Sequence, residues 1–203
     1  ISGVDLTRPL TDALYSEIYQ AFLENQVIFF RDQHMTPEQF LAFARRWGGI
    51  HLHPYMKGLD DYPEILELIK TETDTYAFGS SWHSDQMFAP KPAKCTMLLG
   101  REIPPAGGDT MFANMYLAYE SLSDGMKAML RRIRALNSGD KKRAGNGRNR
   151  AERYSGASGM KLKDPGNIQT DSVHPLIRTH PDTGRQSLYI GSHTQHFDGF
   201  TPE

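Results

Sequence analysis

Trp82-His83-Ser84-Asp85 places a histidine and an aspartate two positions apart. In an extended strand successive side chains point to opposite faces, so residues two apart share a face. An imidazole nitrogen and a carboxylate oxygen would then converge on one point. These are two of the three ligands of the 2-His-1-carboxylate site, which holds non-heme Fe(II) and leaves coordination positions open. A surface or hydrogen-bonded His83 is the alternative interpretation of so short a motif.

The composition narrows the class of protein. The 203 residues carry 23 Lys and Arg against 24 Asp and Glu, so neither nucleic acid nor an anionic membrane is expected as the main partner. No apolar run reaches the 18 or more residues of a membrane span. The single cysteine, Cys95, cannot form an internal disulfide. A cytoplasmic setting is therefore expected.

The two ends predict a fragment of a longer chain. The sequence starts at Ile1 without a methionine, and Thr201-Pro202-Glu203 is typical of the opening of a helix. We therefore expect residues 1–203 to form a single domain that is truncated at its C-terminus.

Three stretches are expected to be helical. Leu14, Ile18 and Phe22 recur at helical spacing and predict a helix over residues 11–25. Thr36-Pro37-Glu38-Gln39 is a capping box that begins a second helix, which is expected to run to Trp47. Residues 114–136 predict helical structure, with Ser123-Asp124 as a second N-cap signal within it. Its apolar stripe, with its methionines, is expected to pack on a sheet.

Short β-rich runs make up much of the rest. Strands are expected at residues 27–30, 63–69, 95–99 and 110–112. Residues 173–180 and 185–190 flank Pro181-Asp182-Thr183-Gly184 and predict a hairpin. The expected class is mainly β with flanking helices.

Residues 138–158 differ from their surroundings. They are basic, rich in glycine and nearly free of apolar side chains. Such a segment buries too little surface to offset its ordering entropy, so a mobile loop is expected, either a solvated insertion or a lid.

Four motifs carry a family resemblance. In chain order they are Ile1-Ser2-Gly3-Val4-Asp5-Leu6, Trp82-His83-Ser84-Asp85, Gly107-Gly108-Asp109-Thr110 and His174-Pro175-Leu176-Ile177-Arg178-Thr179-His180-Pro181 with Gly184. In order and spacing the sequence resembles the taurine/chlorophenoxyacetate dioxygenase family of Fe(II)- and 2-oxoglutarate-dependent oxygenases. The resemblance implies a double-stranded β-helix (jelly roll), here lacking its C-terminal strands.

The resemblance also implies residue roles. His83 and Asp85 correspond to iron ligands, and Thr110 to the threonine whose hydroxyl contacts the 2-oxoglutarate carboxylate. A hydroxyl at the start of a strand is the alternative for Thr110, and Gly107 and Gly108 are interpreted as turn residues. The family's second iron-binding histidine and its 2-oxoglutarate-binding arginine lie in a later segment. The chain as given is therefore expected to be inactive.

Four residues are candidate substrate contacts. His53 corresponds to a histidine that contacts the sulfonate in the taurine enzyme, although a loop histidine is the alternative. Met56 and Gly79 replace a tyrosine and an asparagine of that enzyme, which puts taurine itself in doubt. With Tyr55 and Phe88, His53 suits a small anion with an apolar body. His193 is interpreted as lining the pocket, and His196 as exposed to solvent. A role as the third iron ligand is the alternative for either histidine.

The expected activity is hydroxylation of a sulfonate, alkyl sulfate or phenoxyalkanoate with release of succinate and CO2. Fe(II) is the cofactor, 2-oxoglutarate the cosubstrate and O2 a partner, and a homo-oligomer is possible. One alternative is a non-catalytic jelly-roll binding module with an incomplete metal site. Another is a hydrolytic zinc site on a similar barrel.

Overall fold

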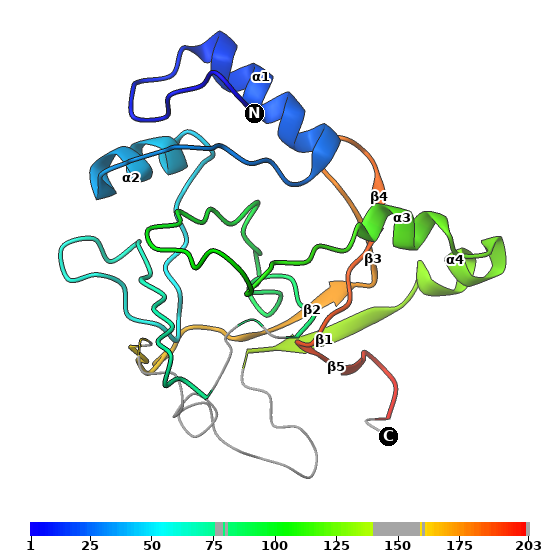
Figure 1. Cartoon of the computed structure of the whole chain (residues 1–203). Helices are drawn as coiled ribbons and strands as arrows, with labels where there is room; N and C mark the ends of the chain where they lie inside the picture. The colour runs from blue at the N-terminus through cyan, green and yellow to red at the C-terminus, as the bar shows by residue number, and fades with distance from the viewer. Residues whose placement is uncertain (76–78, 80, 140–158, 160, 202–203) are drawn as a thin grey trace. The chain divides into compact units, whose positions relative to one another are not determined.

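The computed structural model describes residues 1–75, 79, 81–139, 159 and 161–201 (Figure 1). The chain divides into two compact units, Ile1–Glu67 and Leu68–Glu203. Of the predicted mobile loop at residues 138–158, Ser138 and Gly139 belong to the described residues, and residues 140–158 lie outside them.

The first unit contains the two helices expected from capping signals. α1 (Asp12–Asn25) begins where the Thr11 hydroxyl accepts a hydrogen bond from the Leu14 N–H. α2 (Pro37–Arg45) begins with the full capping box of Thr36 and Gln39. The expected extension of α2 to Trp47 is wrong, because regular helix ends at Arg45.

Aromatic rings form the core of the first unit. Trp47 is 9% exposed. Four rings, from both helices, lie 5.2 to 6.0 Å from its ring: Tyr15, Tyr19, Phe22 and Phe43. Several of these contacts are edge-to-face, a geometry that adds to the stabilisation from burial alone.

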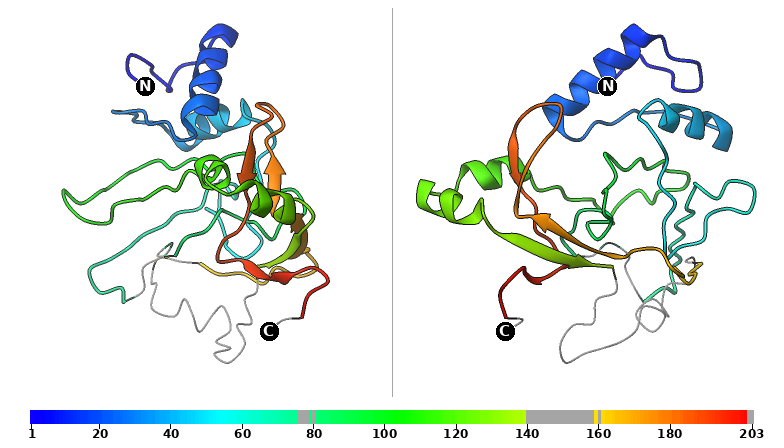
Figure 2. Two further views of the ribbon diagram at one scale, coloured as in Figure 1. Left: turned by 90° about the vertical axis from the view of Figure 1, so that its right-hand side faces the viewer. Right: turned by 180° about the vertical axis from the view of Figure 1, so that it is seen from behind.

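The second unit contains the strands. β1 (Arg134–Ser138) pairs antiparallel with β2 (Asp171–Pro175) on one side and with β5 (Thr194–Phe197) on the other (Figures 1 and 2). β3 (Ile177–Thr179) and β4 (Gln186–Leu188) form the predicted hairpin. Together with few helices, this antiparallel structure agrees with the expected mainly β class.

The hairpin is shorter than expected at its N-terminal side. Residues 173–175 pair with β1 rather than with the returning hairpin strand. Pro175 has no N–H to donate, so the ladder is interrupted there. The Leu176 N–H donates instead to the Ile133 carbonyl, and its own carbonyl accepts from the Tyr189 N–H. The chain thus changes sheets at Leu176.

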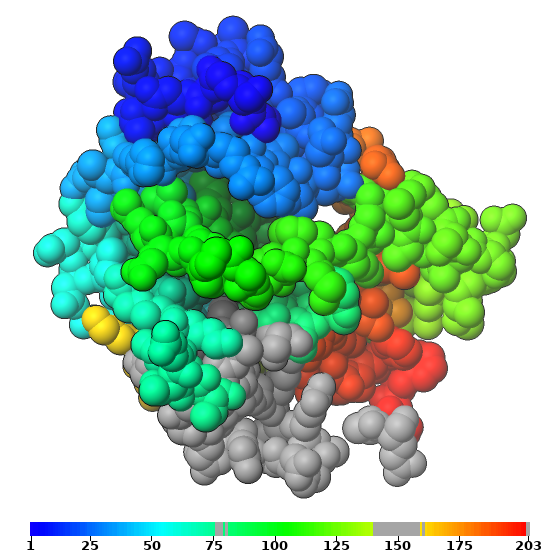
Figure 3. All heavy atoms as spheres, in the orientation of Figure 1, coloured from blue at the N-terminus to red at the C-terminus, as the bar shows by residue number. Residues whose placement is uncertain are grey.

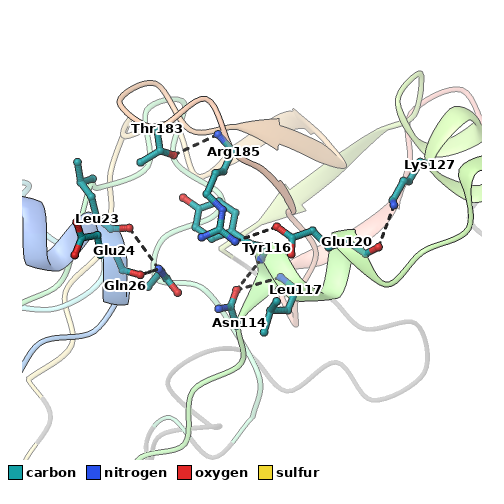
Figure 4. Close-up of polar contacts among 10 residues, drawn as sticks. All are labelled: Leu23, Glu24, Gln26, Asn114, Tyr116, Leu117, Glu120, Lys127, Thr183 and Arg185. Atoms are coloured by element: carbon teal, nitrogen blue, oxygen red, sulfur yellow. Dashed lines mark hydrogen bonds and ion pairs between the residues drawn. The ribbon is translucent and has the colours of Figure 1, made fainter.

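The helical structure predicted over residues 114–136, with its second N-cap signal at Ser123, is confirmed as far as Leu130 and is wrong beyond it. It is two short helices, α3 (Met115–Glu120) and α4 (Asp124–Leu130), each with its own N-cap residue, Asn114 and Ser123. Figure 4 shows the Asn114 cap on Tyr116 and Leu117. Residues 134–136 belong to β1, because strand pairing outweighs helix propensity.

Two details of this region also differ from expectation. Met126 and Met129 are exposed rather than packed on a sheet. Figure 4 also shows Arg185, which follows the hairpin turn, paired with Glu120 at the end of α3 at 3.0 Å.

Four expected strands are not formed among the described residues: 27–30, 63–69, 95–99 and 110–112. They lack ladder partners, apart from an isolated bridge between Ile69 and Gly159. Residues 98–112 carry exposed apolar side chains such as Leu98 and Met111, and Figure 3 shows this segment, in green, at the surface. Within the described ranges, no helix is long and apolar enough to cross a membrane.

Candidate functional site

His83 and Asp85 face one another. The His83 Nε2 lies 3.2 Å from the Asp85 Oδ1, and the two side chains are 29% and 47% exposed. They do not lie on a regular strand, as the sequence predicted, but on an extended run that enters a turn at Asp85. Gln86 continues this turn with φ of 51°, and its carbonyl accepts from the Ala89 N–H. The two donor atoms converge although the expected strand is absent.

The second ring nitrogen of His83 sets the orientation of the imidazole. Its Nδ1 lies 2.6 Å from the Ser81 carbonyl oxygen, which can only accept, so the Nδ1–H donates. In the neutral ring, Nε2 then carries a lone pair directed at a carboxylate oxygen. Two such acceptors are held together by a cation between them, either a proton or a metal ion.

The spacing of the pair fits a metal ion. Two adjacent ligands of an octahedral ion, with bonds of about 2.1 Å, lie about 3.0 Å apart. The observed separation is 3.2 Å. Imidazole nitrogen with carboxylate oxygen is a donor set typical of Fe(II). The residues present therefore fit one part of a metal site.

The Asp85 carboxylate has a second partner. Its Oδ2 accepts a hydrogen bond of 2.6 Å from the Thr96 hydroxyl. Both residues line a cavity of about 280 Å³, together with Lys94, Arg178 and others. The sequence interpretation missed Thr96, because the motif at residues 82–85 does not show that Asp85 will find a hydrogen-bond donor eleven residues further along the chain.

A segment far along the chain supports the loop that carries the pair. The Ser192 N–H donates to the Trp82 carbonyl at 3.1 Å. A β-carbon at Gly191 would lie 3.0 Å from the Met87 Sδ and 3.5 Å from the His83 Cα. Met87 itself is fully buried. The sequence interpretation missed this role of Gly191.

His174 supports the end of the same loop. It is 8% exposed, and its Nε2–H donates to the Ala89 carbonyl at 2.9 Å. Burial is the main cause that lowers the pKa of His174, and the charges of Arg178 and Arg134 lower it further. The structure thus gives His174 a structural role.

Two of the predicted substrate residues lie in contact. The rings of Phe88 and His193 are 5.2 Å apart at 68°. The His193 Nδ1–H donates to the Ser138 carbonyl at 3.1 Å, and the Ser138 N–H donates to the His193 carbonyl at 2.9 Å. These bonds tie His193 to the end of β1. His196 lies on β5 and is half-buried, not solvent-exposed as considered.

Thr110 lies on an exposed, extended run. Gly107 and Gly108 precede it with φ of 85° and 70°, a backbone conformation that favours glycine. Both angles agree with a role of these glycines in backbone geometry.

His53 and Tyr55 belong to the first unit. The His53 Nδ1 accepts hydrogen bonds from the Tyr55 and Met56 N–H groups, both 3.1 Å long. Tyr55 is 5% exposed and Met56 is 4% exposed. The imidazole therefore closes a local turn, and its Nε2 carries the proton in the neutral ring.

No set of three His, Cys, Asp or Glu side chains in the described part of the chain could hold a metal ion. Within that part, His83 and Asp85 bring two candidate metal ligands together.

Comparison with known proteins identifies the family. A family model described as taurine catabolism dioxygenase TauD, TfdA family matches residues 1–203. The chain is 30% identical over 212 residues to an (S)-phenoxypropionate/alpha-ketoglutarate-dioxygenase of Sphingobium herbicidovorans, covering 100% of this chain and 70% of that protein. It is also 30% identical to an alkylsulfatase of Acinetobacter baylyi, covering 99% of this chain and 62% of that protein.

A solved structure extends the match to the fold. The crystal structure of a taurine dioxygenase from Burkholderia xenovorans superposes with a TM-score of 0.73 at 32% identity, covering 98% of this chain and 62% of that one. The chain therefore belongs to the TauD, TfdA family of dioxygenases. It spans between 62% and 70% of the length of these three proteins.

Proposed function

We propose that the protein is an Fe(II)- and 2-oxoglutarate-dependent dioxygenase that hydroxylates a small organic anion and releases succinate and CO2. The observation that carries the proposal is the 3.2 Å approach of the His83 Nε2 to the Asp85 Oδ1. Family membership supports it, because the three relatives are named for phenoxypropionate, alkyl sulfate and taurine. The candidate substrates are accordingly a phenoxyalkanoate, an alkyl sulfate or a sulfonate.

In this proposal His83 and Asp85 hold the iron. The Ser81 carbonyl keeps the His83 Nδ1 protonated, which leaves Nε2 as the ligand atom. When bound, Fe(II) and 2-oxoglutarate supply the oxidation that transfers one oxygen atom of O2 to the substrate and the other to succinate. The protein's part is to hold the reactants in position and to exclude water.

Thr110 and four further residues bind the organic molecules in this proposal. The Thr110 hydroxyl donates to a carboxylate of 2-oxoglutarate. The His53 Nε2–H, which its turn leaves as the donor, binds the anionic group of the substrate. Tyr55, Phe88 and His193 are further substrate contacts in this proposal.

The finer description of the fold is also a proposal. We infer that the strands belong to a double-stranded β-helix whose C-terminal strands, third iron ligand and 2-oxoglutarate-binding arginine lie outside these 203 residues. The share of the relatives' length that the chain spans supports this inference. The single cysteine supports a cytoplasmic location.

Succinate release tests the function. Full-length protein loaded anaerobically with Fe(II) is mixed with 2-oxoglutarate, O2 and a panel of sulfonates, alkyl sulfates and phenoxyalkanoates. We expect succinate in proportion to the hydroxylated product, and none from His83→Ala, which lacks a ligand. An iron-loaded protein that binds the panel without forming succinate would be a binding module. Hydrolysis of a substrate with Zn(II) but without 2-oxoglutarate would instead identify a hydrolase.

A further inference from the structure

The two oxygens of the Asp85 carboxylate have different partners. Oδ1 lies 3.2 Å from the His83 Nε2, whereas Oδ2 accepts the 2.6 Å hydrogen bond from the Thr96 hydroxyl. A hydroxyl bonded to an ionised carboxylate at this length is a strong, charge-assisted hydrogen bond. One oxygen is thus engaged by the protein while the other faces the imidazole.

This bond limits the rotation of the carboxylate. The terminal torsion of an aspartate side chain is broad and roughly two-fold, so either oxygen can take either place. A donor fixed on one oxygen removes that freedom. Threonine is a suitable donor, because its branched β-carbon restricts the first side-chain torsion.

The backbone around position 96 explains why the hydroxyl reaches Asp85. From Cys95 to Gly100 half-buried and exposed residues alternate, as they do along an extended strand. Cys95 is half-buried, and burial raises the pKa of its thiol. Thr96 lies on the opposite, exposed side of the run. A shift of one residue would exchange the two side chains and remove the donor.

We propose that Thr96 is a positioning residue that holds Asp85 so that it binds the metal through Oδ1 alone. This inference rests on the proposed function, because it assumes that Asp85 is a ligand. Hydrogen bonds from outside the ligand shell orient metal-binding carboxylates, and their loss weakens metal affinity by about 10- to 100-fold. Thr96 is exposed, so water can replace its hydroxyl in part. We therefore expect the loss of metal affinity to lie near the lower end of that range.

The experiment measures Mn(II) affinity of the full-length protein by electron paramagnetic resonance. Thr96→Val removes the hydroxyl and keeps the shape, and Thr96→Ser keeps the hydroxyl. Thr7→Val is a matched control, because the Thr7 hydroxyl also donates to an aspartate, Asp5, at 2.6 Å but serves no proposed ligand. His83→Ala tests the metal site itself.

We expect Thr96→Val to raise the Kd for Mn(II) about 10-fold. Thr96→Ser and Thr7→Val should bind like the wild type, and the Tm of the metal-free protein should be the same for all. With Co(II) bound, the visible absorption spectrum of Thr96→Val should also differ from that of the wild type, because the carboxylate can then bind through both oxygens.

Other outcomes overturn the inference in separable ways. If Thr96→Val binds Mn(II) like the wild type while His83→Ala has lost binding, the metal site stands and Thr96 has no part in it. If Thr96→Ser fails to restore the affinity and both variants lower the Tm, Thr96 is structural. If His83→Ala binds as tightly as the wild type, the histidine–carboxylate pair is no metal site, and the proposed function falls as well.

Discussion

Gly191 is packed so closely against Met87 that a β-carbon at position 191 would lie 3.0 Å from the Met87 Sδ. Met87 is fully buried and has little room to move away. The same β-carbon would be 3.5 Å from the His83 Cα. The absence of a side chain at Gly191 therefore lets the loop with His83 and Asp85 rest against the backbone that follows the hairpin.

Gly191→Ala should destabilise the protein by about 1–3 kcal/mol, the usual cost of adding a methyl group to a packed site. It should also weaken metal binding, because the extra carbon pushes on the loop that carries His83. Urea unfolding and a Mn(II) titration measure the two effects.

Gly125→Ala is the matched control for that change. Gly125 lies in α4, and a β-carbon there would meet nothing within 4 Å. Alanine is the better helix former, so a gain of about 0.5–1 kcal/mol is expected. Equal stability of the Gly191→Ala protein and the wild type would contradict the role given to this contact.

Stability should fall in mildly acidic solution because of His174. Its pKa in the folded protein is below the ordinary value of 6.5, first because of burial. Between the lowered pKa and 6.5 the unfolded chain binds more protons than the folded one, so acid favours unfolding. The contribution of neutral His174 is complete above pH 6.5 and is lost as the pH drops below that value.

Urea unfolding from pH 8 to pH 5 checks this prediction. His174→Gln keeps an N–H donor that can reach the Ala89 carbonyl but has no charge to gain. The free energy of unfolding of this variant should depend less on pH than that of the wild type. Parallel pH profiles for the two proteins would show that another group is responsible.

Variants of His53 can separate its role in the local turn from its proposed role in substrate binding. Its Nδ1 accepts the Tyr55 and Met56 N–H groups, and an asparagine side-chain oxygen can take that place. His53→Asn should therefore preserve the turn and its stability. If the Nε2–H binds the substrate anion, KM should rise about 10-fold with kcat little changed.

His53→Ala is the companion variant, because it removes both functions. It should raise KM in the same way and also lower the Tm. An unchanged KM in His53→Asn would leave His53 as a turn residue only, the alternative considered from the sequence.

Local signals in the sequence predicted local structure well. Thr11 and Thr36 cap the two helices of the first unit, where the sequence places hydroxyl residues before apolar, helical spacing. The hairpin around Gly184 is confirmed for the same reason, since a turn of fixed geometry joins strands close in sequence. His83 and Asp85 meet because only one residue separates them.

Partners distant in sequence could not be predicted in this way. Residues 95–99 and 110–112 have strand-like sequences, but a strand also needs a neighbour to pair with, and composition does not show one. Residues 134–136 were assigned to a helix, and pairing with residues 173–175 makes them a strand. Thr96 and Gly191 reach the candidate site through folding of the whole second unit.

The dependence of the His83 loop on Gly191 and Ser192 has a consequence for protein synthesis. Both residues follow Asp85 by about a hundred positions, a delay of about 5 to 20 seconds at ordinary rates of translation. During that interval a nascent chain leaving the ribosome carries His83 and Asp85 without the backbone support that orients them. If His83 and Asp85 are the iron ligands proposed above, we expect tight iron binding only after Gly191 and Ser192 have been synthesised and have packed against this loop.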